Sequence, residues 1–122
     1  MPFVKIDLPA ILMPEYGQAI SDAVQTALVD CFHIPMGDRF QVLTPHAPEQ
    51  MVITEQLNGL THGHLWCLVN ITCNHGRTAP MKQTLFAQIS RQIAAVSPIA
   101  SADVIIYIVE MCPDNSSVVV AA

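Results

Sequence analysis

One order of hydrophobic patterns occurs twice in this chain, and the duplication restricts its possible folds more than any other feature. In the first half, apolar residues alternate, then recur at helical spacing, then alternate again, over 3–8, 20–31 and 39–44. The second half repeats the strand, helix and strand patterns over 65–72, 85–96 and 104–111. The sequence therefore predicts two successive β-α-β units.

A shift of 65 residues superposes the two halves without a gap. Under this shift Pro2 falls on Cys67, and Asp38 falls on Asp103. Agreement of the elements over about forty residues is stronger evidence of a repeat than any count of identical residues. We therefore predict one domain over residues 1–122, with internal repeats at about 2–45 and 65–111.

Each β-α-β unit contributes two parallel strands, because a parallel connection needs a crossover helix. Two units predict an α+β fold: a four-stranded mixed sheet with two helices on one face. The other face would be bare, and only 12% of the residues are charged while 52% are hydrophobic. We therefore expect another subunit to cover that face. The polar segment between the units predicts a short hairpin or an extended piece near 51–54.

Composition argues against several classes of protein. A net charge of −5 with only five Lys and Arg residues makes a nucleic-acid partner unexpected. The longest apolar run near the end, 104–109, is far too short to span a membrane. The first ten residues do not resemble a signal peptide. The cysteines are therefore expected to be free, buried thiols in a reducing cytoplasm: Cys31, Cys67, Cys73 and Cys112.

Pro2 stands directly before the first predicted strand. A sheet tolerates proline at the first residue of a strand, so this position alone favours a purely structural role. If Met1 is removed, however, Pro2 carries a free secondary amine. A solvated α-amine has a pKa of about 7.7–8.0, so it can accept and return a proton near neutral pH.

Four stretches, MPFVKIDL, GDRFQVLT, NHGRTAPMKQTLFAQI and DVIIYIVE, together resemble the tautomerase superfamily. The most similar branch is that of malonate semialdehyde decarboxylase and its tautomerase-like relatives. The resemblance runs from Pro2 to about Asn115, nearly the whole chain. It implies the doubled β-α-β fold, assembly as a homotrimer, and catalysis by an amino-terminal proline without a cofactor.

The resemblance also implies roles for individual residues. Pro2 is the candidate catalytic amine, and Asp38 corresponds to a carboxylate that activates water or holds the proline. Arg77 corresponds to the family's substrate-binding arginine, and His75 falls where the decarboxylase has a further arginine. At 116–118 this chain has Ser-Ser-Val where the family has an aromatic Trp-Ser-Phe run. These two departures alter the substrate-binding side of the expected site.

Three functions fit these residues. With a proline pKa at or below about 7, Pro2 serves as general base and acid for keto–enol isomerisation of a small 2-oxo acid, whose carboxylate Arg77 binds. If Asp38 lies close and keeps Pro2 charged, Asp38-activated water gives decarboxylation or hydration of a small oxo or unsaturated acid instead. The third function is that of a non-catalytic trimeric binding protein.

Simpler interpretations of the same residues remain open. Asp38 follows a glycine in a turn-forming pair, and Arg77 is compatible with a solvated position at the start of a helix. His75 is equally compatible with a loop position that has no role. The spacing of other candidate ligands matches no zinc pattern, so we expect no metal site among His62, His64, Cys73 and His75.

Overall fold

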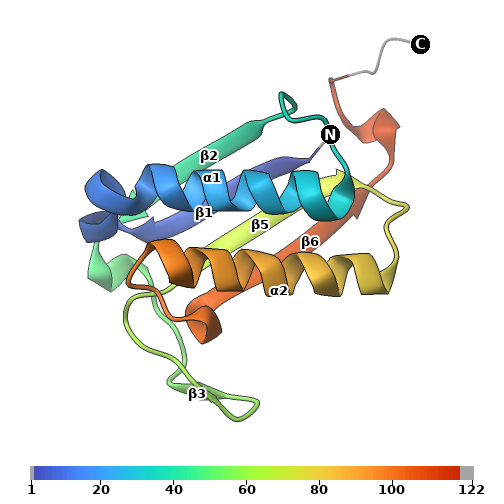
Figure 1. The fold of residues 1–122 in the computed structure, drawn as a ribbon. Helices are drawn as coiled ribbons and strands as arrows, with labels where there is room; N and C mark the ends of the chain where they lie inside the picture. The colour runs from blue at the N-terminus through green and yellow to red at the C-terminus, as the bar shows by residue number, and fades with distance from the viewer. Residues whose placement is uncertain (1, 119–122) are drawn as a thin grey trace.

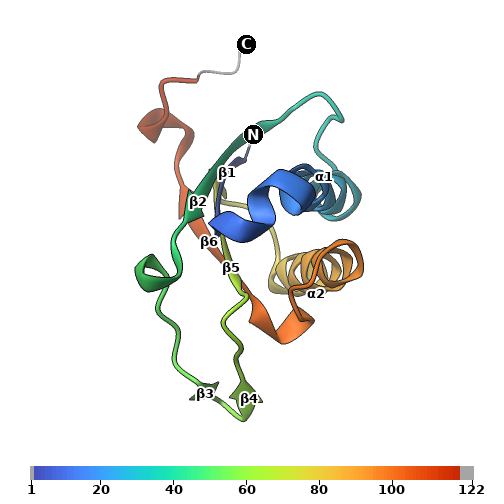
Figure 2. The same ribbon diagram turned by 90° about the vertical axis from the view of Figure 1, so that its left-hand side faces the viewer.

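A computed structural model describes residues 2–118 of the chain. Its main sheet has the strand order β2-β1-β5-β6, formed by β1 (Phe3–Pro9), β2 (Phe40–His46), β5 (Cys67–Asn74) and β6 (Val104–Met111). Two helices lie side by side on one face of the sheet, α1 (Met13–Phe32) and α2 (Ala79–Val96) (Figures 1 and 2). This arrangement confirms the predicted α+β fold. Short 3-10 helices occupy η1 (Ala10–Leu12), η2 (Pro48–Gln50), η3 (Ser101–Asp103) and η4 (Pro113–Asn115).

The strand registers of the two units are equivalent. β1 and β2 are parallel with Phe3 opposite Phe40, and β5 and β6 are parallel with Cys67 opposite Val104. The partners are 37 residues apart in both units. β1 and β5 are antiparallel, and their register places Lys5 opposite Asn70, two positions that differ by the repeat length of 65. An internal two-fold axis therefore passes between β1 and β5.

The core lies between the sheet and the two helices. Alternate residues of β1 and β5 are buried, as a period of two requires: Val4, Ile6, Leu8, Cys67, Val69, Ile71 and Cys73. The apolar stripes of the helices cover them, and residues such as Ile20, Leu28, Leu85 and Ile89 have 0–1% of their surface exposed. The regular alternation explains why the sequence located these elements.

Local sequence explains where the helices begin and end. Pro14 and Pro80 each lie in the first turn, where a missing backbone N–H leaves no helical hydrogen bond unmade. The Oγ1 of Thr78 caps α2 by accepting the backbone N–H of Met81 at 3.3 Å. α1 ends at His33, whose left-handed backbone (φ 57°) turns the chain away from the helix.

The face of the sheet opposite the helices carries apolar side chains in contact with solvent. They alternate with the core residues, and those with the largest exposed fractions are Phe40, Val42, Tyr107 and Val109, at 41–58%. The sheet is therefore covered on one side only, as the sequence predicted.

An arm of residues 51–64 joins the two units and projects beyond the sheet (Figure 2). We expected a hairpin or an extended piece at 51–54; this stretch has no regular structure, and the hairpin lies later, at β3 (Gln56–Leu57) and β4 (Leu60–Thr61). Asn58 and Gly59 form its turn with φ of 51° and 80°, the left-handed conformations that a tight hairpin requires. Likewise, β5 spans Cys67–Asn74 instead of the predicted 65–72.

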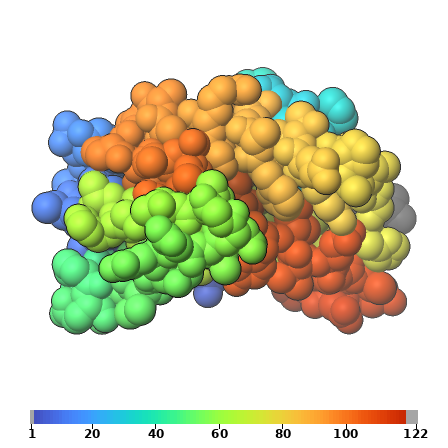
Figure 3. Space-filling model, turned by 90° about the horizontal axis from the view of Figure 1, so that it is seen from below, coloured from blue at the N-terminus to red at the C-terminus, as the bar shows by residue number. Residues whose placement is uncertain are grey.

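A buried hydrogen bond fixes the arm to the body. His62 and Asp103 are 9% and 6% exposed, and the Nδ1 of His62 lies 3.1 Å from the Oδ1 of Asp103. The backbone N–H of Gly63 donates to both carboxylate oxygens of Asp103 at 3.2 Å. In Figure 3, seen from below, the arm lies against the segment that precedes β6. The side chain of Asp103 therefore joins the arm to the second repeat at this end of the sheet.

The cysteines correct one expectation. All four are free thiols, and Cys31, Cys67 and Cys73 are buried, but Cys112 is exposed because it follows the last residue of β6. Burial raises the pKa of the Cys67 thiol to about 12. Among residues 2–118, no helix combines the length and the apolar character needed to cross a membrane.

We predict that His62→Ala loosens the arm, because it leaves the buried Asp103 carboxylate without its imidazole partner. The free energy of unfolding should fall by about 1–3 kcal/mol in urea titrations, and hydrogen exchange should accelerate over 54–64. His64→Ala is the matched control, because that side chain is exposed on the same arm. Equal stability of the two variants would contradict a role for this contact.

Candidate functional site

Most of the predicted site residues lie at one end of the sheet, which we call the proline end. Here β1 and β2 begin, β5 and β6 end, α1 ends, and α2 begins (Figure 1). The antiparallel pairing of β1 with β5 brings residues from both repeats to this end. Positions far apart in the sequence, near 2, 38 and 77, therefore lie at the same end of the sheet.

Pro2 is buried directly before β1. Phe3 pairs with Phe40 on one side and Thr72 on the other, so continuing both registers places Pro2 between Arg39 and Cys73. Met1 lies outside the described residues, and its removal stays a prediction.

Asp38 lies in the loop between α1 and β2 and is half-buried. Its backbone N–H donates to the carbonyl of Pro35 at 3.0 Å, which closes a turn. Its own carbonyl accepts a hydrogen bond of 3.0 Å from the side-chain amide of Gln25, which is only 7% exposed. This buried glutamine on α1 fixes the loop. If the β1–β2 register is continued, Arg39 is the neighbour of Pro2, and Asp38 is the residue before Arg39.

Arg77 lies in the turn of residues 75–78 that leads from β5 into α2, as the sequence predicted. Its Nη1 donates to the carbonyl of Asn74 at 3.2 Å, and its guanidinium carbon lies 5.0 Å from the centre of the Phe32 ring. Gly76 has a φ of 130°, a conformation that favours glycine, so this turn depends on the Gly-Arg pair. The turn brings the guanidinium to the end of α1.

A second cation at this end, Arg39, is bound elsewhere. Its Nη2 donates at 2.7 Å both to the Oδ1 of Asp22 and to the Oγ of Ser21 on α1. The hydrogen bond from Arg39 lowers the pKa of the Asp22 carboxyl. The guanidinium of Arg39 is therefore directed toward α1, although its backbone neighbours Pro2.

Glu110 on β6 holds the turn that carries Arg77. Its Oε1 accepts a hydrogen bond of 2.8 Å from the Nζ of Lys82, and its carboxylate also accepts one from the backbone N–H of Gly76. These contacts, led by the hydrogen bond from Lys82, lower the pKa of Glu110. His75 is exposed, and its backbone N–H donates to the carbonyl of Met111 at 3.1 Å.

The segment 116–118 follows η4 and has no aromatic side chain. The backbone N–H of Val118 donates to the Oγ of Ser116 at 3.1 Å, and both residues are half-buried. As the sequence indicated, this part of the C-terminal segment forms a short turn without an aromatic side chain.

The residues considered as metal ligands do not come together. His62 and His64 lie on the arm, whereas Cys73 and His75 lie at the proline end, about 20 Å away along β5 at roughly 3.3 Å per residue. Within residues 2–118, no three His, Cys, Asp or Glu side chains form a group that suits a metal ion.

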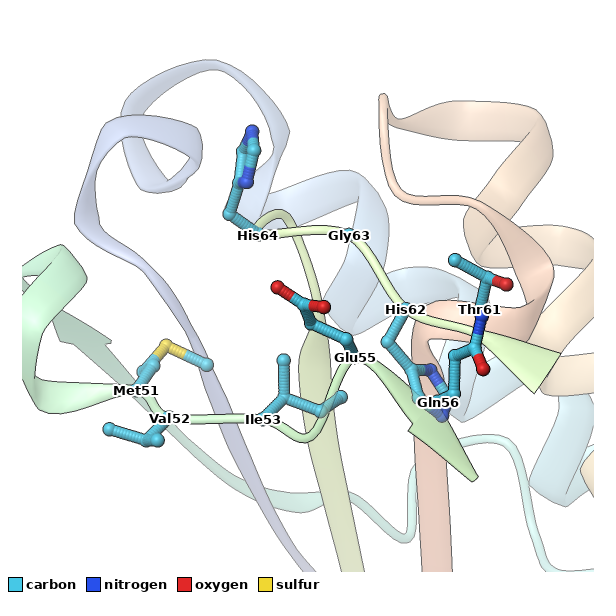
Figure 4. A pocket seen from close by; sticks show the side chains of 9 residues that line it. All are labelled: Met51, Val52, Ile53, Glu55, Gln56, Thr61, His62, Gly63 and His64. Atoms are coloured by element: carbon cyan, nitrogen blue, oxygen red, sulfur yellow. The ribbon is translucent and has the colours of Figure 1, made fainter. Parts of the chain in front are cut away.

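A surface pocket of about 510 Å³ lies beside the arm, away from the proline end. Figure 4 shows Met51, Val52 and Ile53 along one stretch of the chain and His62 to His64 along the facing stretch. His62 is already bound to Asp103. None of the predicted site residues lines this pocket.

Sequence reasoning missed three residues that organise the proline end. Gln25 interrupts the apolar stripe of α1, and a buried polar residue in such a stripe is a detectable signal for a hydrogen-bonding role. Phe32 and Glu110 gave no comparable signal, because their contacts with the 75–78 turn depend on tertiary packing.

The chain is similar to known proteins in sequence and in fold. The model of a family described as "tautomerase enzyme" matches residues 38–118. Probable tautomerase YrdN of Bacillus subtilis (strain 168) is 24% identical over 110 residues, which cover 90% of this chain and 84% of that protein.

Two solved structures extend the comparison. FG41 malonate semialdehyde decarboxylase inhibited by 3-bromopropiolate is 35% identical, with a TM-score of 0.87, over 94% of this chain and 87% of that one. The Q0 fused 4-OT wild type, described as a symmetric trimer, has the same fold with 18% identity and a TM-score of 0.79; 95% of this chain and 90% of that chain are covered.

We predict that Lys82→Met raises the pKa of Glu110 toward its ordinary value of 4.5, because the largest contribution to its lowering is removed. Carbon-detected NMR titration of the glutamate carboxyls measures this shift, with Lys5→Met as the control at an exposed lysine. Folding lowers the pKa of Glu110. Its contribution to the free energy of unfolding is therefore fully present above the pKa of the unfolded chain, and is lost as the pH falls through the pKa of the folded chain. An unshifted Glu110 titration in Lys82→Met would contradict the assignment.

Proposed function

The chain belongs to the tautomerase enzyme family, and from this premise we propose that it isomerises a small 2-oxo acid between keto and enol forms, with Pro2 as general base and acid. The observation that supports the proposal most directly is the location of buried Pro2 and of Arg77 at the same end of the sheet. Removal of Met1 would give Pro2 a free secondary amine.

In the proposed reaction, the Pro2 amine removes a proton from the carbon next to the substrate carbonyl and delivers it to the oxygen of the resulting enolate, which gives the enol; in the reverse direction the proton passes from the enol oxygen to that carbon. Arg77 binds the substrate carboxylate, since its planar guanidinium suits two oxygens and is always charged. The turn also precedes the N-terminus of α2, where backbone N–H groups favour an anion. If Met1 is removed, burial of the amine and a cation close to it would both disfavour its charged form, which suits a base.

Decarboxylation of a small 3-oxo acid, or hydration of an unsaturated acid, is the second candidate. Two observations favour it. The β1–β2 register places Asp38 directly before Arg39, the neighbour of Pro2, and the chain is similar to FG41 malonate semialdehyde decarboxylase. A carboxylate close to the amine would keep Pro2 charged, and Asp38 would then activate water. His75, in place of a second arginine, would be a weak anchor because a neutral imidazole carries no charge.

We further propose that the chain assembles as a homotrimer through the uncovered face of its sheet. The exposed apolar residues of this face and the symmetric trimer of a fused 4-OT with the same fold support this assembly. Light scattering at micromolar concentration should give about three times the mass of one chain. A stable monomer would contradict the assembly and leave the bare face unexplained.

We predict that Arg77→Ala lowers kcat/KM for a 2-oxo acid such as phenylpyruvate. The decrease should correspond to a loss of roughly 2–4 kcal/mol of transition-state stabilisation, because the developing anion loses a charge-assisted contact. Arg91→Ala is the control, since Arg91 lies on α2 beside a different surface pocket. His75→Ala should have a much smaller effect. An unchanged kcat/KM in Arg77→Ala would mean that this arginine is only a surface residue.

We predict that intact mass shows the loss of Met1 and that activity depends on the Pro2 amine. For a tautomerase, the pH–rate profile should rise through an ionisation near or below about 7. An ionisation above about 8 would favour the decarboxylase or hydratase instead. Pro2→Ala should reduce activity at least about tenfold, although its primary amine can retain some function. A full-length mass, or a variant that matches wild type at every pH, would refute catalysis by Pro2.

A further inference from the structure

The guanidinium of Arg77 lies over the aromatic ring of Phe32, and this contact joins the two repeats at the proline end. The guanidinium carbon is 5.0 Å from the ring centre, within the range of about 6 Å at which a cation is attracted to an aromatic face. Phe32 is the last residue of α1, whereas Arg77 lies just before α2. The contact therefore depends on the packing of one repeat against the other.

Phe32 is a rigid support for this cation. Only 4% of its surface is exposed, and it belongs to the hydrophobic core. The left-handed residue His33 ends the helix directly after it, and the backbone N–H of His33 donates to the carbonyl of Val29 at 3.1 Å. A buried ring at a capped helix end has little freedom to move, so it defines one place for the guanidinium.

The other contact of Arg77 restricts its direction. Nη1 donates to the carbonyl of Asn74 at 3.2 Å, which takes one edge of the guanidinium plane while the Phe32 ring takes one face. An arginine side chain is long and otherwise free to adopt many rotamers. A face contact and an edge contact together fix both the position and the tilt of the plane, which leaves its other N–H groups to bind a carboxylate.

We propose that Phe32 is a positioning residue that aims Arg77 at the substrate, and that it thereby sets the preference of the site for carboxylate-bearing molecules. This inference rests on the proposed function, because it requires Arg77 to bind the substrate carboxylate. Phe32 itself touches Arg77 and the core and needs no contact with the substrate. An aliphatic side chain of similar size would fill the core but would offer no aromatic face to the cation.

The test compares binding of an inert carboxylate, benzoate, with binding of neutral benzamide in wild type, Phe32→Leu and Phe32→Tyr, measured by NMR titration. Phe32→Leu should raise the Kd of benzoate about 2- to 12-fold, because a guanidinium that is no longer held in place must be ordered when the carboxylate binds. The Kd of benzamide should change less than twofold. Phe32→Tyr keeps the aromatic face and should retain the benzoate preference.

The same variants should show the same selectivity in turnover. For Phe32→Leu, kcat/KM for phenylpyruvate should fall, whereas kcat/KM for its neutral methyl ester should not. Ile20→Val controls for a loosened core, because Ile20 is fully buried earlier on the same helix. This control should lower the melting temperature without changing the ratio of the two Kd values.

The outcomes separate the inference from the proposed function. If Arg77→Ala weakens benzoate binding but Phe32→Leu leaves it unchanged, Arg77 binds carboxylates and the positioning role of Phe32 is wrong. If Phe32→Leu weakens benzoate and benzamide equally, Phe32 acts only through the core, and the inference is likewise overturned. If Arg77→Ala also leaves benzoate binding unchanged, the proposed role of Arg77 fails, and the role of Phe32 fails with it.

Discussion

The antiparallel pairing of β1 with β5 is the constraint on which the rest of the structure depends. Because Lys5 lies opposite Asn70, the two repeats are related by a two-fold axis perpendicular to the sheet. Such an axis keeps both crossover helices on one face. A slip of one residue would turn Val4 and Ile6 away from the helices and toward solvent. The register therefore fixes the core and both ends of the sheet together.

Those helices and strands that bury one face could be predicted from the periodic spacing of apolar residues in the sequence. Alternation located all four long strands, and the helical spacing located both helices, because burial on one face enforces each period. The apolar spacing located the first helix only from Ile20, whereas α1 begins at Met13, because Pro14, Glu15 and Gly17 interrupt that spacing in its first turns. The prediction for Cys112 was also wrong, because burial was expected from residue type alone, although the last strand pattern ends at 111, one residue earlier.

The candidate site was predictable as a set of residues but not as a geometry. The resemblance identified positions 2, 38, 75 and 77, and the fold brings their backbones to one end of the sheet. The supports of these residues come from side chains far away in sequence, such as Gln25 under the Asp38 loop and Glu110 under the Arg77 turn. Each contact lies within one repeat, between a helix or turn and a segment that only the folded chain brings beside it; buried Gln25 is a detectable signal in the sequence, whereas Glu110 gives none.

The two-fold axis makes the two ends of the sheet equivalent in backbone but not in chemistry. At the proline end Pro2 precedes β1, and at the opposite end Cys67 occupies the equivalent position with a thiol pKa raised to about 12 by burial. A residue inside the chain has its nitrogen in an amide, so only the first repeat can offer a free backbone amine. At the second end, Asp103 is bound by His62 and Gly63 of the arm. One repeat can thus serve chemistry, while its duplicate anchors the connecting arm.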